Sequence, residues 1–107
     1  MSDIQDERYR EIIRQKASEF FELESSGDAL ITVTGVRLIP KSKQVRIFFT
    51  VYPNSKENGV LDFAKRKRSE FREFLKRDSK LSRLPFVDFE IDLGEKNRQL
   101  IDTLSQS

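Results

Sequence analysis

The sequence predicts a single α+β domain with the order α-β-β-α-α-β, in which helices cover one face of a three-stranded sheet. The first observation is length, because 107 residues are enough for one small domain and not for two. The second is composition, since Leu, Ile, Val and Phe make up 31% of the chain, enough to build a core. The third is patterning: two stretches have helical periodicity and three have the alternation of strands. These stripes are buried together most simply in a layer of helices on a sheet.

The first helix is expected over residues 7–24. Apolar side chains recur there at steps of three and four residues, with Lys16 interrupting the stripe. They are Tyr9, Ile12, Ile13, Ala17, Phe20 and Phe21. Gly27 is well suited to the left-handed backbone conformation that follows a helix end, so we expect the helix to stop before it.

Two strands follow, joined by a short turn. Leu30–Leu38 is rich in β-branched residues, but its apolar positions change from odd to even numbers after Gly35. A bulge at Thr34-Gly35 would let both sets face one core, because an extra residue resets a period of two. Residues 40–43 are expected to turn. Gln44–Tyr52 then returns antiparallel to the first strand.

The second helical region is expected from about Val60 to Arg77, with a kink. Its apolar stripe is interrupted by four consecutive basic residues, so an unbroken helix would bring charge onto its buried side. A kink near Lys67–Ser69, with Ser69 capping the second piece, resolves this conflict. The third strand is expected at Phe86–Asp92. We therefore expect a domain over residues 1–94 and a polar, flexible tail over residues 95–107.

Composition excludes several classes of function. The chain has no Cys and no His, which removes disulfide scaffolds, thiol nucleophiles, zinc fingers and histidine-based acid–base catalysis. No apolar run exceeds three residues, and the polar start lacks the apolar stretch of a signal peptide. We expect a soluble cytoplasmic domain that needs no cofactor, contacts no membrane and acts by binding and not as an enzyme.

The net charge of +2 hides a strong asymmetry. Nine basic and three acidic residues between Lys65 and Arg83 give that segment +6, whereas the rest of the chain carries −4. Arg and Lys clustered on a helix are typical of proteins that bind a phosphate backbone. The predicted RNA-binding residues are Lys65, Arg66, Lys67, Arg68, Ser69, Arg72, Lys76, Arg77, Lys80 and Arg83, extended by Lys41, Lys43 and Arg46.

Two other groups of residues suggest weaker alternatives. Asp88, Glu90 and Asp92 alternate along the third strand, a spacing that would also suit Mg²⁺ and a metal-dependent hydrolase, but solvated strand faces look the same. Phe48 and Tyr52 lie on the outer sheet face and would be able to stack on bases. We favour a packing role for both, against the first helix or the tail.

Several segments together resemble the ribosome-binding factor A family. Residues 31–38, followed by Pro40 and the strand at 45–51, are similar to the first hairpin of that family, which also shifts its apolar phase midway. Arg72 and residues 81–89 resemble its helix end and the approach to its third strand, and residues 92–104 its closing segment. The resemblance covers about residues 5–104.

The resemblance implies a type II KH-like fold and a role in assembling the small ribosomal subunit. In that family a helix kink, commonly Ala-x-Gly, replaces the Gly-x-x-Gly loop of KH domains, and no Gly-x-x-Gly occurs in this chain either. Lys67 and Ser69 stand where the family has small residues, so this sequence keeps the position of the kink but not the close backbone approach that Ala or Gly allows.

We therefore expect a monomeric, non-enzymatic assembly factor that binds the immature small (30S) subunit and its 16S rRNA and assists rRNA processing. The phosphates would supply affinity and the folded shape of the RNA most of the selectivity. The alternative is a protein-interaction module whose basic face binds an acidic protein partner.

Overall fold

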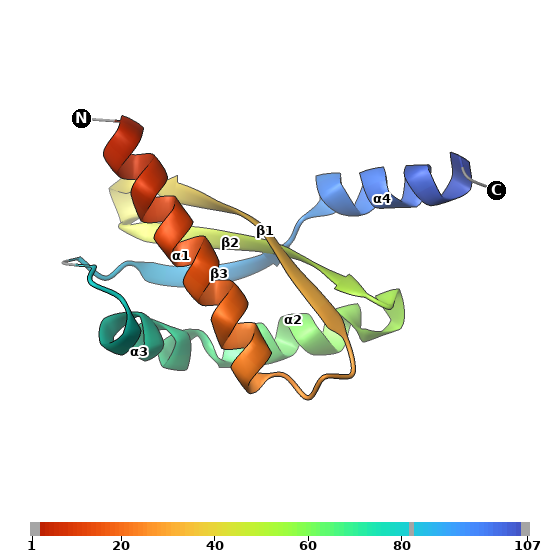
Figure 1. Cartoon of the computed structure of the whole chain (residues 1–107), viewed down its shortest axis with the longest axis horizontal. Helices are drawn as coiled ribbons and strands as arrows, with labels where there is room; N and C mark the ends of the chain where they lie inside the picture. Colours follow the sequence, from red (N-terminus) through yellow and green to blue (C-terminus); the bar gives the residue numbers. More distant parts are fainter. Residues whose placement is uncertain (1–2, 82, 106–107) are drawn as a thin grey trace.

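The computed structural model of the chain describes residues 3–81 and 83–105 and confirms the predicted α+β architecture (Figure 1). Residues 1–2 of the expected domain and 106–107 of the expected tail lie outside this description. The elements are α1 (Asp3–Glu24), β1 (Leu30–Ile39), β2 (Gln44–Tyr52), α2 (Glu57–Arg66), α3 (Arg68–Asp78), β3 (Phe86–Ile91) and α4 (Leu93–Ser105).

The sheet has the order β1-β2-β3, with β2 in the centre. β2 pairs antiparallel with β1, as expected from the short turn, and parallel with β3. The register shifts between Val33 and Gly35, which confirms the bulge at Thr34. Because of the bulge, Val36 and Leu38 lie opposite Ile47 and Val45, on the face that also carries Val33.

Helices α1, α2 and α3 lie on one face of the sheet (Figure 1). Their inner sides meet the sheet in a core dominated by phenylalanine, because rings from α1, β2, α3 and β3 contact one another at 5.3–6.5 Å between centroids. Phe89 is fully buried and contacts Phe21 of α1, Phe49 of β2 and Phe71 of α3. One side chain on β3 therefore connects α1, β2 and α3.

The connections differ from the expected boundaries in detail. The turn between β1 and β2 is a short 3₁₀ helix over Pro40–Ser42 that ends with Lys43 in the left-handed region, at φ 55°. Gly27 lies three residues beyond the end of α1 and has φ +86°, the left-handed conformation expected of it. α2 begins at Glu57, three residues before the expected start, since a 3₁₀ turn over Asn54–Lys56 leads directly into it.

The segment expected to be a polar tail forms helix α4, which extends away from the sheet (Figure 1). Asp92, expected to end the third strand, instead caps this helix: its Oδ1 accepts a hydrogen bond from the N–H of Glu95 at 3.0 Å. Its Oδ2 accepts a hydrogen bond from the hydroxyl of Thr34 in the β1 bulge. Lys96 pairs with Glu57 at 3.0 Å, so the first turn of α4 is also tied to α2.

Within residues 3–81 and 83–105, no helix combines the length and the apolar character needed to cross a membrane.

Replacing Phe89 with Ala tests the connecting role of this side chain. We expect the free energy of unfolding to fall by about 3–5 kcal/mol, because a fully buried ring with three aromatic neighbours is lost. Urea denaturation measures the change. The control Leu23→Ala, at a side chain 69% exposed, should change stability by less than about 0.5 kcal/mol. Equal effects of the two substitutions would contradict the assigned core.

Asp92→Asn tests the cap of α4 through its pH dependence. The hydrogen bond from Thr34, followed by the N–H of Glu95, lowers the pKa of Asp92 below its usual value. A lowered pKa means that the stabilisation is complete above the unfolded value of about 3.9 and disappears as the pH falls through the folded pKa. At pH 7 the free energy of unfolding of the wild type should exceed that of the variant by about 1 kcal/mol, and this difference should vanish at acidic pH. A difference that does not depend on pH would show that the ionised carboxylate is not responsible.

Candidate nucleic-acid interface

The break between α2 and α3 falls at Lys67, the first residue of the range Lys67–Ser69 in which a kink is predicted. Lys67 has φ −95° and ψ 9°, and its N–H still donates to the carbonyls of Phe63 and Ala64 at 3.0 and 3.1 Å. Its own carbonyl accepts a hydrogen bond from the N–H of Phe71 at 2.8 Å. The backbone therefore changes direction at Lys67 while the helical hydrogen bonds on both sides are kept. No side chain caps α3, and the expected capping by Ser69 is wrong because Ser69 lies one residue inside the helix.

Three basic side chains gather at this break: Lys65 and Arg66 end α2, and Arg68 begins α3. With Asp62 they line a shallow surface hollow of about 740 Å³. Arg66 is exposed, and among the described residues its side chain donates a hydrogen bond only to the carbonyl of Asp62, at 3.4 Å. We call Lys65, Arg66 and Arg68 the helix-break cluster. It is the part of the basic segment whose side chains line one hollow together.

Asp88 on β3 faces this cluster. Its Oδ1 lies 2.8 Å from Lys65 Nζ and 3.2 Å from Arg68 Nη1, and it also accepts the N–H of Phe89 at 2.9 Å. Burial raises the pKa of Asp88, but the hydrogen bonds from Lys65 and Phe89 and the two nearby positive charges outweigh it and lower the pKa overall. An ionised carboxylate at neutral pH therefore lies beside the cluster, which the basic segment alone does not reveal.

Lys67, the central residue of the segment, is directed away from the cluster. Its ammonium lies 3.3 Å from Glu70 and 3.6 Å from Glu24, and 5.6 Å from the centroid of the Phe63 ring. Its charge is thus balanced by two carboxylates, one from α1 and one from α3. It ties the helix break to α1 and presents little free positive charge.

Arg72 and Arg83 also hold the fold together. Arg72 donates to the carbonyls of Pro85 and Leu84 at 2.9 and 3.4 Å and stacks over the Phe86 ring at 4.9 Å. Arg83 lies 5.6 Å from the Tyr9 ring, and its carbonyl accepts the Tyr9 hydroxyl at 3.2 Å. These two arginines anchor the segment between α3 and β3.

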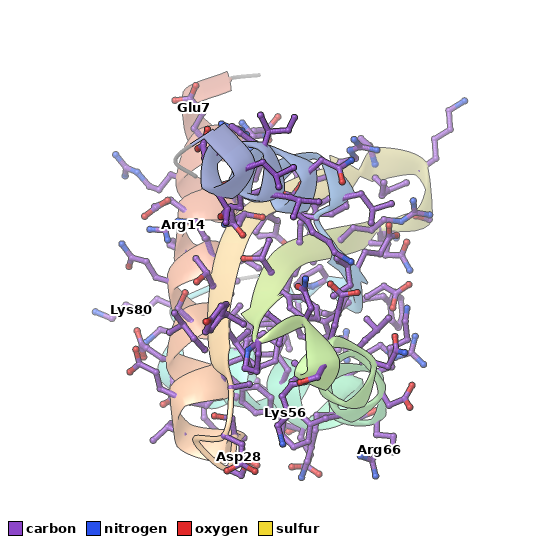
Figure 2. All side chains as sticks on the ribbon, turned by 90° about the vertical axis from the view of Figure 1, so that its right-hand side faces the viewer. Glu7, Arg14, Asp28, Lys56, Arg66 and Lys80 are labelled. Atoms are coloured by element: carbon purple, nitrogen blue, oxygen red, sulfur yellow. The ribbon has the colours of Figure 1, made fainter. Side chains whose placement is uncertain are left out.

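The remaining predicted residues are spread more widely. Lys76 and Lys80 are exposed and have no ionic partner in the part of the chain that the structure describes, and Arg77 lies 3.9 Å from Asp78. Figure 2 shows Arg66 and Lys80 projecting towards opposite sides of the molecule. The thirteen predicted residues therefore do not form one continuous patch.

The turn between β1 and β2 is brought towards α3. The Lys43 carbonyl accepts a hydrogen bond from the N–H of Phe86 at 3.0 Å. The turn therefore lies beside Phe86, whose ring is covered by the guanidinium of Arg72. Lys41 and Lys43 are exposed, and neither ammonium has an ionic partner among the described residues. Arg46 faces outward opposite Asp88, with its Nε 3.4 Å from Glu90 but not hydrogen-bonded to it.

The outer sheet face corrects two of the weaker interpretations. Tyr52 is 73% exposed, so the packing role favoured for it is wrong. Phe48 is half-buried, and its ring centroid lies 5.5 Å from Cζ of Arg37. The three carboxylates of the suggested metal site go to separate partners: Asp88 to the helix-break cluster, Glu90 to Arg46, and Asp92 to Thr34 and α4. Within residues 3–81 and 83–105, no three or more Asp, Glu, His or Cys side chains lie together in a way that would hold a metal ion.

Fold and surface together define a small KH-like domain with a basic helix break. The family model for ribosome-binding factor A matches residues 5–105, and the chain belongs to this family. It is a family of ribosome-associated maturation factors, with no known enzymatic activity. The ribosome is accordingly the partner that membership implies.

Solved structures show the same fold. The crystal structure of ribosome-binding factor A from Thermus thermophilus is similar with a TM-score of 0.68 and 20% identity, over 78% of this chain and 91% of that one. A Thermotoga maritima protein, provisionally described as a ribosome-binding factor A and solved by solution NMR, has a TM-score of 0.58 and 12% identity, over 81% and 82%. Comparison with curated protein sequences finds no match.

Substitution of Arg72 separates the anchoring arginines from the exposed ones. Arg72→Ala should lower the free energy of unfolding by about 1–2 kcal/mol, because two carbonyls lose their donor and Phe86 loses its stacking partner. Arg66→Ala, which removes the same charge from an exposed position, should change it by less than about 0.5 kcal/mol. Urea denaturation distinguishes them, and equal losses would contradict the division.

Proposed function

We propose that this protein binds the immature small ribosomal subunit through phosphates of its 16S rRNA and assists rRNA processing without catalysing a reaction. It acts as a monomer in the cytoplasm. The observation that carries the proposal is the helix-break cluster, in which Lys65, Arg66 and Arg68 converge on one exposed hollow. The family assignment supplies the ribosome as the partner, and the cluster supplies a surface that suits RNA.

Charge and geometry both favour a phosphate backbone as the target. Guanidinium groups bind phosphate oxygens with two parallel hydrogen bonds, and exposed lysines add attraction without sequence preference. Arg68, Arg72 and Lys76 follow one another at steps of four residues on one side of α3, so positive charge continues along that helix. The described residues offer no glycine-rich loop for a phosphate and no histidine or thiol for catalysis.

The protein-interaction alternative rests on the same charges, because an acidic protein surface would also fit them. The two partners differ in their response to nuclease. If nuclease treatment releases the chain from small subunits, the complex depends on RNA; retention after complete digestion would favour an acidic protein partner.

Salt dependence tests the electrostatic mechanism. Binding of the chain to purified small-subunit precursors should weaken steeply as salt rises, since each neutralised phosphate releases counterions. The double variant R66Q/K76Q should bind about tenfold more weakly at low salt and show a shallower dependence of log K on log salt, by about one to two units. Co-sedimentation at several salt concentrations provides both measurements.

The matched control is R14Q/R98Q, which also removes two positive charges. Arg14 pairs with Glu11 within α1 and Arg98 with Glu95 within α4, so both lie outside the basic segment. Figure 2 shows Arg14 and Arg66 in different parts of the molecule. If the control loses as much affinity as R66Q/K76Q, net charge determines binding, and not the basic surface formed by the helix-break cluster and α3.

A further inference from the structure

Asp88 joins two cations that belong to different helices. Lys65 lies in the last turn of α2 and Arg68 is the first residue of α3, with the break at Lys67 between them. Both reach the same oxygen, Oδ1 of Asp88, at 2.8 and 3.2 Å. Among the described residues, no other carboxylate forms an ion pair with either of them, so Asp88 is the one carboxylate that links the two charges.

The carboxylate is the rigid member of this group. Asp88 lies on β3 between Val87 and Phe89, both buried, and its Oδ1 also accepts the N–H of Phe89. Its side chain is 22% exposed, whereas those of Lys65 and Arg68 are 40% and 49% exposed. Long, exposed basic side chains lose rotamer entropy when a ligand immobilises them. Asp88 restricts both side chains before any ligand arrives.

The group retains one positive charge and several free donors. Two cations and one carboxylate leave a net charge of +1, which matches the single negative charge of a phosphodiester. Lys65 donates one of its three N–H groups to Asp88. Arg68 donates Nε–H to the carbonyl of Lys65 at 3.0 Å and Nη1–H to Asp88, which leaves Nη2 without a partner in the described structure.

We propose that Asp88 is a positioning residue that holds Lys65 and Arg68 together across the helix break as a site for one RNA phosphate. This inference rests on the proposed function and assigns its central contact. An acidic residue inside a basic surface ordinarily weakens RNA binding by repulsion. Here three donors already engage its oxygen, so its charge is compensated locally, and the ordering of two flexible cations is the larger effect.

The test uses Asp88→Asn and a matched control, Glu90→Gln. Both substitutions remove one negative charge from the same face of β3, but Glu90 pairs with Arg46 and not with the helix-break cluster. With a transcript of small-subunit rRNA as the probe, D88N should bind roughly five- to tenfold more weakly despite its extra positive charge, with a shallower salt dependence. E90Q should bind as well as wild type or more tightly. Asp88→Glu should restore part of the affinity.

A double-mutant cycle separates positioning from a general loss of structure. In the background K65Q/R68Q there are no cations left to position, so adding D88N should leave affinity unchanged or raise it. If D88N weakens binding equally in that background, or if D88N alone binds as tightly as E90Q, the assignment is overturned while the proposed function stands. If wild type does not bind the transcript or the subunit precursors at all, the proposed function itself fails, and the positioning role fails with it.

Discussion

The buried ring of Phe89 is the contact on which the other features depend. It holds α1, β2 and α3 against β3 through Phe21, Phe49 and Phe71, and it fixes the strand in register with β2. Because side chains alternate along a strand, an inward Phe89 forces Asp88 outward. The same packing that builds the core therefore places a carboxylate where the ends of α2 and α3 meet. The geometry of the basic surface follows from the position of an apolar side chain.

The basic residues around the helix break and the start of β3 fall into two groups, one that stabilises the fold and one that stays accessible. Lys67, Arg72 and Arg83 are occupied by carboxylates, carbonyls and aromatic rings, so they stabilise the helix break and the segment that leads to β3. Lys65, Arg66 and Arg68 remain accessible in the hollow at the break. The charge of +6 in this segment consequently overstates what is available to RNA. What makes the surface suitable is the convergence of a few exposed cations, and not the total.

Periodicity in the sequence is enough to predict the core helices and strands, because their apolar residues recur regularly. The bulge at Thr34 and the break between α2 and α3 are also predictable, because each interrupts that regular apolar pattern. Helix α4 was missed: Leu93, Leu100, Ile101 and Leu104 have helical spacing, but Asp92 continues the alternation of β3 and resembles a strand residue as much as a helix cap. The basic segment was located from charge alone. The partners of its members were not, since they depend on how β3 pairs with β2 and how the helices pack on that sheet.

A cryo-electron microscopy structure of the chain bound to a small-subunit precursor would test the proposed interface most directly. We expect rRNA phosphates within hydrogen-bond distance of Lys65, Arg66 and Arg68, with Asp88 still bridging the two cations on either side of the helix break. A complex in which this hollow faces solvent or a protein, while another face of the domain contacts the RNA, would contradict it.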